Sequence, residues 1–219
     1  MEHNIFLDIE TIPCQRPDVI QRFRDDVKPP GNIKKPESIE AWLAENRDTA
    51  AAEAIAKTSF DPSLGHICTI AWATDDDDVT AAHAATVDDE AGVMGAFFAS
   101  LQPHHNYTFV GHYIGGFDLR FILCRAVVLG IQIPRCIPRD PKPWDRNMFD
   151  TMTAWAGQKG SIGMDRLCEA FGLEGKGDFD GSQVAAAWAN GEHQKIAEYC
   201  ADDVRRTRSI WLRFQAAGW

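Results

Sequence analysis

The stretch NIFLDIET, residues 4–11, alternates apolar and polar side chains in the way of a β-strand. Its three aliphatic residues share one face, and Asp8 and Glu10 share the opposite face. Apolar neighbours predict that this strand lies inside a sheet. Two adjacent carboxylates there repel each other and are costly to bury. A bound divalent cation would remove both the repulsion and the cost of burial. The alternative is an exposed strand face that carries two surface acids.

Further strands and helices are predicted on either side of later turn signals. Strands are expected at 66–73, 79–86 and 107–112, and helices at 38–57, 88–102, 117–130, within 161–172, 182–190 and 192–215. The segment 148–155 fits either a strand or the start of a helix. Early strands followed by alternating helices favour an α/β sandwich. We expect one domain over residues 1–219, with a loop-plus-helix insertion at about 28–60.

Composition excludes several classes of protein. The chain has 219 residues, of which 45% are hydrophobic and 25% charged, and its net charge is −10. This apolar share suits a globular core and argues against disorder. Neither a membrane span nor a signal peptide is expected, since no apolar run is long enough. The acidic balance argues against coating duplex DNA by bulk charge. Six unpaired, core-type cysteines predict a cytoplasmic protein.

A third acid, Asp118, follows a glycine pair in GHYIGGFDLRF, residues 111–121. It falls in the first turn of a predicted apolar helix, where a negative charge gains about 0.3–1 kcal/mol from the helix dipole. Helix capping is therefore the alternative to a role in a binding site. The glycine pair would let a ligand approach the backbone closely.

The last predicted helix carries a fourth acid. Tyr199 and Asp203 are four residues apart and so share one helix face, at the edge of the stripe that should face the core. Asp202 points away and is expected to be exposed. The alternative for Asp203 is a surface ion pair with Arg206, three residues further along.

In order, DIET (8–11), GGFDLRF (115–121) and YCADD (199–203) resemble the three motifs of the DEDD 3′–5′ exonucleases. The chain is similar to the exonuclease domain of family B DNA polymerases, and more closely to the stand-alone predicted exonucleases related to that domain. The stretches 60–71 and 172–184 agree, so the resemblance covers about residues 4–215. It implies a ribonuclease H-like, three-layer sandwich with a mixed five-stranded sheet flanked by helices.

The resemblance also implies the active-site residues. Asp8, Glu10, Asp118 and Asp203 match the four acids that hold two divalent metal ions, Mg²⁺ or Mn²⁺, and Tyr199 matches the residue that orients the attacking water. A glutamate rather than a histidine five residues before the last aspartate places the chain in the tyrosine branch. The implied reaction is two-metal-ion hydrolysis of phosphodiester bonds from the 3′ end of single-stranded DNA.

Four further residues are candidate substrate contacts: Thr11, Tyr113, Phe117 and Lys176. Tyr113 stands where polymerase-type members commonly have an asparagine that touches the terminal nucleotide, which leaves the preference for DNA or RNA open. Stacking on a base is one interpretation of Tyr113 and Phe117; packing in the core is the other. Lys176 is either a phosphate contact or an ordinary loop lysine.

Alternative functions remain open at this stage. They are an RNA-trimming enzyme like ribonuclease D, a non-hydrolysing nucleic-acid-binding module, and an acidic protein that stores metal or is purely structural. The four acids together with Tyr199 argue against the last two. The expected partner is single-stranded nucleic acid, DNA before RNA, and any proofreading would need a separate polymerase or repair protein; no membrane partner is expected.

Overall fold

The computed structural model describes residues 2–142, 145–175 and 177–219. In these ranges five strands form one mixed sheet in the order β3-β2-β1-β4-β5. The strands are β1 (Glu2–Ile12), β2 (His66–Thr74), β3 (Thr80–His83), β4 (Asn106–Gly111) and β5 (Met148–Asp150). The central strand β1 is antiparallel to β2 and parallel to β4. The strand predicted at 4–11 is therefore the middle of the sheet.

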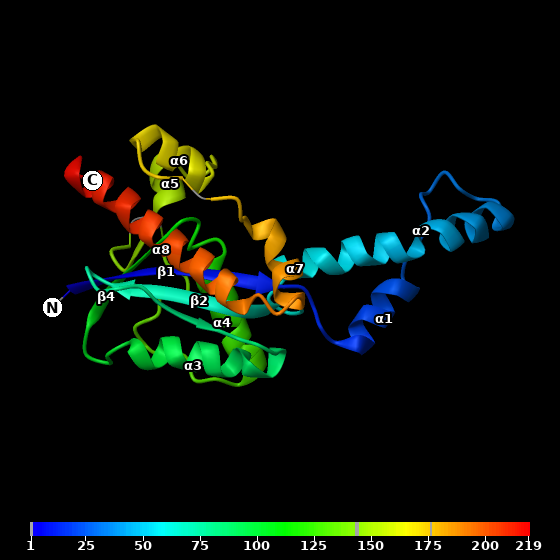
Figure 1. Ribbon diagram of the computed structural model, residues 1–219, viewed down its shortest axis with the longest axis horizontal. Helices are drawn as coiled ribbons and strands as arrows, with labels where there is room; N and C mark the ends of the chain where they lie inside the picture. The colour runs from blue at the N-terminus through cyan, green and yellow to red at the C-terminus, as the bar shows by residue number, and fades with distance from the viewer. Residues whose placement is uncertain (1, 143–144, 176) are drawn as a thin grey trace.

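Helices cover both faces of this sheet (Figure 1). They are α1 (Pro17–Asp25), α2 (Pro36–Ala56), α3 (Glu90–Ser100), α4 (Asp118–Leu129), α5 (Thr151–Ala156), α6 (Met164–Phe171), α7 (Val184–Ala189) and α8 (His193–Ala216), with short 3₁₀ helices η1 (Lys57–Phe60), η2 (Val87–Asp89) and η3 (Gly181–Gln183). Side chains of α3 and α4 pack on one face and those of α8 on the other, which makes three layers. None of the helices in the described ranges is long and apolar enough to cross a membrane.

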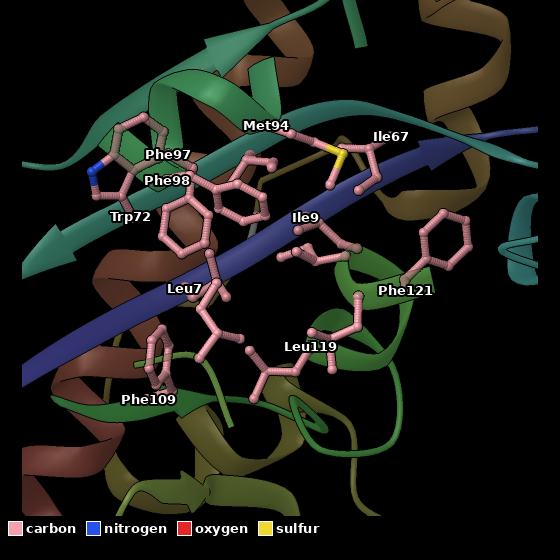
Figure 2. Close-up of a cluster of buried hydrophobic side chains, with 14 of the residues drawn as sticks. Leu7, Ile9, Ile67, Trp72, Met94, Phe97, Phe98, Phe109, Leu119 and Phe121 are labelled. Atoms are coloured by element: carbon pink, nitrogen blue, oxygen red, sulfur yellow. The ribbon is translucent and has the colours of Figure 1, made fainter. Parts of the chain in front are cut away.

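Successive side chains of β1 point to opposite faces of the sheet and enter two separate hydrophobic cores. Leu7 and Ile9 point into the larger core, where Phe97 of α3 and Leu119 of α4 meet them (Figure 2). Phe6 points to the opposite face and packs in the cluster that α8 covers. Each fully buried side chain of this size contributes about 1.5–3 kcal/mol. Asp8 and Glu10 lie on the same side of β1 as Phe6, so their carboxylates point toward α8.

The stretch predicted as a loop and a helix at about 28–60 contains a loop that leads into α2. A helix that the sequence analysis did not anticipate, α1, precedes the loop and lies beside α2. Both helices begin with a proline, at Pro17 and Pro36, a residue favoured at the first helical position. Figure 1 shows this pair extending from the end of the sheet toward which β1 runs.

The sequence of segment 148–155 fits either a strand or the start of a helix, and the structure contains one after the other. It forms the edge strand β5 and then turns into α5 at Asp150, whose side chain accepts hydrogen bonds from the backbone amides of Met152 and Thr153. Asp150 is therefore the N-cap of α5, and the same residue ends β5. The strand predicted at 79–86 is shorter, ending at His83, because Thr86 and Asp89 form a capping box that starts η2.

Candidate active site

The side chains of Asp8 and Glu10 project side by side from β1, on the face that α8 covers. The Cys200 thiol of α8 lies 3.2 Å from Asp8 Oδ2, which ties the helix to the strand at this point. The Cys200 side chain is buried, and burial raises the pKa of its thiol, so the thiol keeps the proton that it donates. Asp8 therefore belongs to the interface between sheet and helix rather than to a solvated strand face.

Three carboxylates meet in this interface. Asp8, Glu10 and Asp203 each offer one oxygen, and the three oxygens lie within 4.8 Å of one another. Asp8 and Glu10 are half-buried and Asp203 is buried. Carboxylate oxygens are the ligands that Mg²⁺ and Mn²⁺ prefer. The fold thus assembles, from two distant segments, a donor set suited to a hard divalent cation.

Burial and neighbouring negative charges both raise the pKa of Asp8. Burial is the largest cause that raises its pKa, and the neighbouring charges of Asp118 and Glu10 raise it further. The Cys200 hydrogen bond and the Arg206 charge act in the opposite direction without offsetting these causes. A carboxyl in this setting is poorly suited to carry a negative charge without a cation, which is the behaviour expected of a metal ligand.

Asp118 is the first residue of α4 and lies on the open edge of β1. The pairing of β1 with β4 extends only from Glu2 to Phe6, so the next part of β1 is free for other partners. In this unpaired part of β1, the Ile9 amide donates a hydrogen bond to Asp118 Oδ1 at 3.1 Å. The Asp118 side chain is 4% exposed, and burial raises its pKa to about 7. Asp118 is thus fixed to the backbone between Asp8 and Glu10, although it lies outside the three-oxygen cluster.

The loop before Asp118 is anchored by Asp150. The Asp150 carboxylate accepts hydrogen bonds from the amides of Tyr113, at 3.0 Å, and Gly115, at 3.3 Å. His112 adds a second anchor, with Nδ1 2.9 Å from the Thr151 hydroxyl and Nε2 2.9 Å from a backbone carbonyl. Burial lowers the pKa of His112, which favours the neutral ring. These contacts hold the loop and hence the start of α4.

Asp203 makes the ion pair that was the alternative interpretation of its position. Arg206, one turn further along α8, contacts Asp203 and also Asp165 of α6, the latter at 2.9 Å. The side chains of Arg206 and Asp203 are 10% and 12% exposed, so this is a buried pair rather than a surface one. Membership of the carboxylate cluster and pairing with Arg206 are therefore compatible.

Tyr199 lies one turn before Asp203 on the same helix. Its ring meets Phe179 edge-on at 5.1 Å. Burial raises the pKa of its hydroxyl, and the charges of Glu10 and Asp8 raise it further. The hydroxyl therefore stays protonated and available as a hydrogen-bond donor. It borders a cavity of about 400 Å³ between α8 and the segment that follows α6.

The predicted substrate contacts have different surroundings. The Thr11 hydroxyl donates to the Ser59 carbonyl at 2.8 Å. Tyr113 is 46% exposed, so the core interpretation of this residue is wrong. Its φ of 65° is unusual for a tyrosine, and its ring lies over Gly116, where a Cβ would come within 2.3 Å of the ring. Phe117 is half-buried against the larger core. Lys176 lies outside the described residues, although its neighbours line the cavity beside Tyr199.

Sequence reasoning missed three residues that shape the site: His112, Asp150 and Cys200. An aspartate before a helical run is an N-cap signal, so Asp150 could have been found as a cap, but not as the anchor of a loop 35 residues away. Cys200 was recognised only as one of the six core-type cysteines. Its contact with Asp8 spans 192 residues, a separation that no local pattern encodes.

Comparisons with known proteins bear on the family and the fold of the chain. Over residues 60–218 the chain matches the family described as "Predicted 3'-5' exonuclease related to the exonuclease domain of PolB". A solved family B DNA polymerase from the hyperthermophilic archaeon Pyrobaculum calidifontis is similar, with a TM-score of 0.61 and 17% sequence identity. That match covers 97% of this chain and 24% of the polymerase chain, so this chain spans about a quarter of the polymerase's length. No curated protein gives a significant match.

At 17% identity the structural likeness speaks for the fold. It confirms the predicted fold class, a ribonuclease H-like arrangement of a mixed five-stranded sheet with helices. The family match begins after the first motif, so Asp8 and Glu10 precede it, whereas Asp118, Tyr199 and Asp203 lie within it.

Proposed function

This chain belongs to the family of predicted 3′–5′ exonucleases related to the exonuclease domain of PolB, and we propose that it is a metal-dependent enzyme that removes nucleotides from the 3′ end of single-stranded DNA. One observation carries the proposal. Asp8, Glu10 and Asp203 bring carboxylate oxygens within 4.8 Å of one another on a nuclease-family fold. Asp118 is held on the same strand by the Ile9 amide.

The four acids divide between two proposed ion sites. Asp8, Glu10 and Asp203 would hold one Mg²⁺ or Mn²⁺ ion, and Asp118 together with Asp8 would hold a second. Bound divalent ions supply Lewis acidity and lower the pKa of water. The all-carboxylate donor set fits such ions, and a cation would remove the repulsion that raises the pKa of Asp8.

Tyr199 and Arg206 complete the catalytic arrangement in this proposal. The Tyr199 hydroxyl, which holds its proton, donates a hydrogen bond that orients the attacking water in line with the scissile phosphodiester. Arg206 is a positioning residue: its contacts with Asp203 and Asp165 fix the Asp203 side chain on the inner face of α8. Together these residues make the tyrosine-branch arrangement of the DEDD enzymes the preferred interpretation.

The substrate contacts remain proposals. Tyr113 presents an exposed ring in the loop that leads to Asp118, and we assign it a contact with the terminal nucleotide. Thr11 contributes through its bond to the Ser59 carbonyl, which fixes the turn next to the first motif. Lys176 is assigned a phosphate contact from the sequence alone.

The test is digestion of a single-stranded DNA oligonucleotide labelled at its 5′ end. In Mg²⁺ or Mn²⁺ the products should form a ladder that shortens from the 3′ end, and chelator should abolish it. Asp8→Ala should abolish the ladder as well, whereas Asp202→Ala serves as the matched control. Asp202 neighbours Asp203 on α8 but is exposed, and its carboxylate forms a surface ion pair with Arg205, so its loss should leave activity within about twofold of wild type.

Other outcomes would redirect the proposal. Intact DNA with degraded RNA would identify an RNA-trimming enzyme that uses the same site. Activity that survives both chelator and Asp8→Ala would refute the metal-dependent mechanism. Strand binding without hydrolysis in any metal would refute the enzymatic role.

A further inference from the structure

A groove of about 700 Å³ runs along the outer side of α4, and none of the four candidate catalytic acids lines it. Its lining combines aliphatic and basic side chains, chiefly Leu123, Val127, Ile131, Arg120, Arg135 and Arg139. Val127 and Val128 stand next to each other on the helix with 73% and 56% of their surface exposed. Contiguous exposed apolar surface of this kind marks a place where another molecule binds.

One wall of this α4 groove is the segment that follows the helix. Gly130 ends α4 with a φ of 68°, and the Ile131 amide then donates to the Ala126 carbonyl at 2.8 Å. This left-handed helix end turns the chain back toward α4. Ile131 and Ile133 pack partly against the larger core, so the apolar part of the groove is continuous with the interior of the protein.

The opposite wall is the loop that precedes β2. The buried Arg125 guanidinium of α4 donates to the Pro62 carbonyl at 3.2 Å, and Pro62 lines the groove. Glu90 of α3 holds the same guanidinium at 2.6 Å. Because buried contacts fix both walls, the groove exists before any ligand arrives, and binding needs little further ordering of the chain.

Positive charge gathers at the α4 groove, although the whole chain has a net charge of −10. Three arginines line the groove against a single acid, Asp61. Arg120 forms a long ion pair of 3.8 Å with an exposed aspartate, and no carboxylate in the described ranges pairs with Arg135 or Arg139. These guanidinium groups can therefore pair with carboxylates or phosphates of another molecule.

The apolar part of the lining decides between these two acidic ligands. Proteins that hold a single nucleic-acid strand offer aromatic rings on which the bases stack. Among the described residues, no aromatic side chain lines the α4 groove, and leucine, valine and isoleucine supply most of its apolar surface. An aliphatic floor with arginines at its rim fits a peptide whose apolar face enters the groove while its carboxylates meet the rim.

We propose that the α4 groove is the docking site for a partner protein, which inserts a short amphipathic helix with aliphatic residues on one face and acidic residues beside them. The aliphatic face would cover the exposed valines of α4, and the acids would pair with Arg135 and Arg139. This inference does not depend on the proposed hydrolysis, because the groove contains none of the four candidate catalytic acids.

The experiment selects binders on the wild-type protein from a displayed library of random peptides of about 16 residues, enough for about four helical turns. Enriched peptides should be acidic and carry leucine, isoleucine or valine at helical spacing. A labelled synthetic copy of an enriched peptide is then titrated by fluorescence anisotropy. Val127→Glu and Arg135→Glu should each weaken its binding at least about tenfold. A copy with lysines in place of its acids should bind Arg135→Glu more tightly than wild type.

Two matched variants control for the substitutions themselves. Leu212→Glu places the same carboxylate at another exposed aliphatic position near the end of a helix, in α8, and Arg166→Glu reverses an exposed charge on α6. Both should change peptide binding by less than about twofold. The unfolding midpoint of Val127→Glu and its activity on a short DNA strand should stay near those of wild type, because this side chain is exposed and lies outside the carboxylate cluster.

Several results would overturn the docking proposal. It is refuted if no peptide is enriched, if the enriched peptides are basic, or if they bind Val127→Glu and Arg135→Glu as tightly as wild type. Displacement of the peptide by single-stranded DNA, with DNA binding weakened by the same two substitutions, would assign the groove to the nucleic-acid strand instead. A dimer in sedimentation that Val127→Glu dissociates would assign it to a second copy of this chain. Groove-dependent peptide binding by a protein that cleaves no strand would support docking and refute only the proposed function.

Discussion

Replacing Asp118 by asparagine should make the metal-free protein increasingly stable relative to wild type as the pH rises. Burial raises the pKa of Asp118 to about 7 from its usual 3.8. Between these two pH values the folded protein holds a proton that the unfolded chain has released. Stability therefore falls as pH rises through this window, because the folded state binds more protons than the unfolded state. The asparagine side chain does not titrate, so the variant does not lose stability in this way.

The magnitude follows from the pKa difference. A difference of about 3 corresponds to about 4 kcal/mol at 1.36 kcal/mol per pKa unit, and this is the full cost of ionised Asp118 above pH 7. The asparagine carbonyl can still accept the Ile9 amide, but its buried NH₂ group costs about 1–3 kcal/mol without a partner. The variant's advantage over wild type should therefore grow by about 2–3 kcal/mol between pH 5 and pH 8.

Thermal or denaturant unfolding in chelator at pH 5 and pH 8 measures this change. Each kcal/mol moves the midpoint of a chain of this size by about 2–4 °C. Asp202→Asn, at an exposed position on α8, is the control and should show no pH-dependent advantage. An Asp118→Asn advantage that is the same at both pH values, or that is larger at pH 5, would refute the reasoning. Added Mg²⁺ should stabilise wild type more than Asp118→Asn, because the variant lacks one proposed ligand.

Three further predictions concern separate parts of the molecule. Tyr199→Phe should lower kcat by about 10- to 100-fold while leaving KM and the unfolding midpoint close to wild type, because only the orienting hydroxyl is lost; a steady-state assay checks this, and an unchanged kcat would contradict the role. Arg125→Met should destabilise the fold by about 3–5 kcal/mol, because it leaves Glu90 buried without the guanidinium that now lies 2.6 Å away; chemical denaturation measures it, and Lys142→Met, which breaks an exposed pair with Asp140, should cost less than about 1 kcal/mol. Gly65→Ala should cost about 1–3 kcal/mol, because its Cβ would collide with the Thr58 carbonyl; Gly92→Ala, where the Cβ meets no atom within 4 Å, is the control for the same unfolding measurement.

The alternation and motif spacing of the sequence predicted the fold class and most elements. The strand with Asp8, the helix that begins near Asp118 and the last helix all lie within a few residues of their expected bounds. These elements are predictable because a period of two or of 3.6 residues is a local property. The carboxylate cluster was foreseen only through the order of the motifs, since no local pattern states that β1 and α8 touch.

Other features could not be predicted because they depend on tertiary contacts. The helix α1 has only nine residues, and it begins at Pro17 shortly after Pro13, two prolines that read as loop signals. The segment 148–155 was ambiguous because Asp150 ends a strand and caps a helix at once. The exposure of Phe60 was not predicted, because it depends on how the rest of the chain folds around this residue.

The distance along the chain between Asp8 and Asp203 has a consequence for how the protein is made. The first and last acids of the cluster are separated by 195 residues, so the cluster forms only when α8 packs against β1. During synthesis β1 leaves the ribosome long before α8 does, and a nascent chain has β1's acids but no Asp203 to set beside them. A polypeptide that has not yet released α8 should therefore be unable to degrade nucleic acid, and the ribosome, built largely of RNA, is the nearest nucleic acid to it.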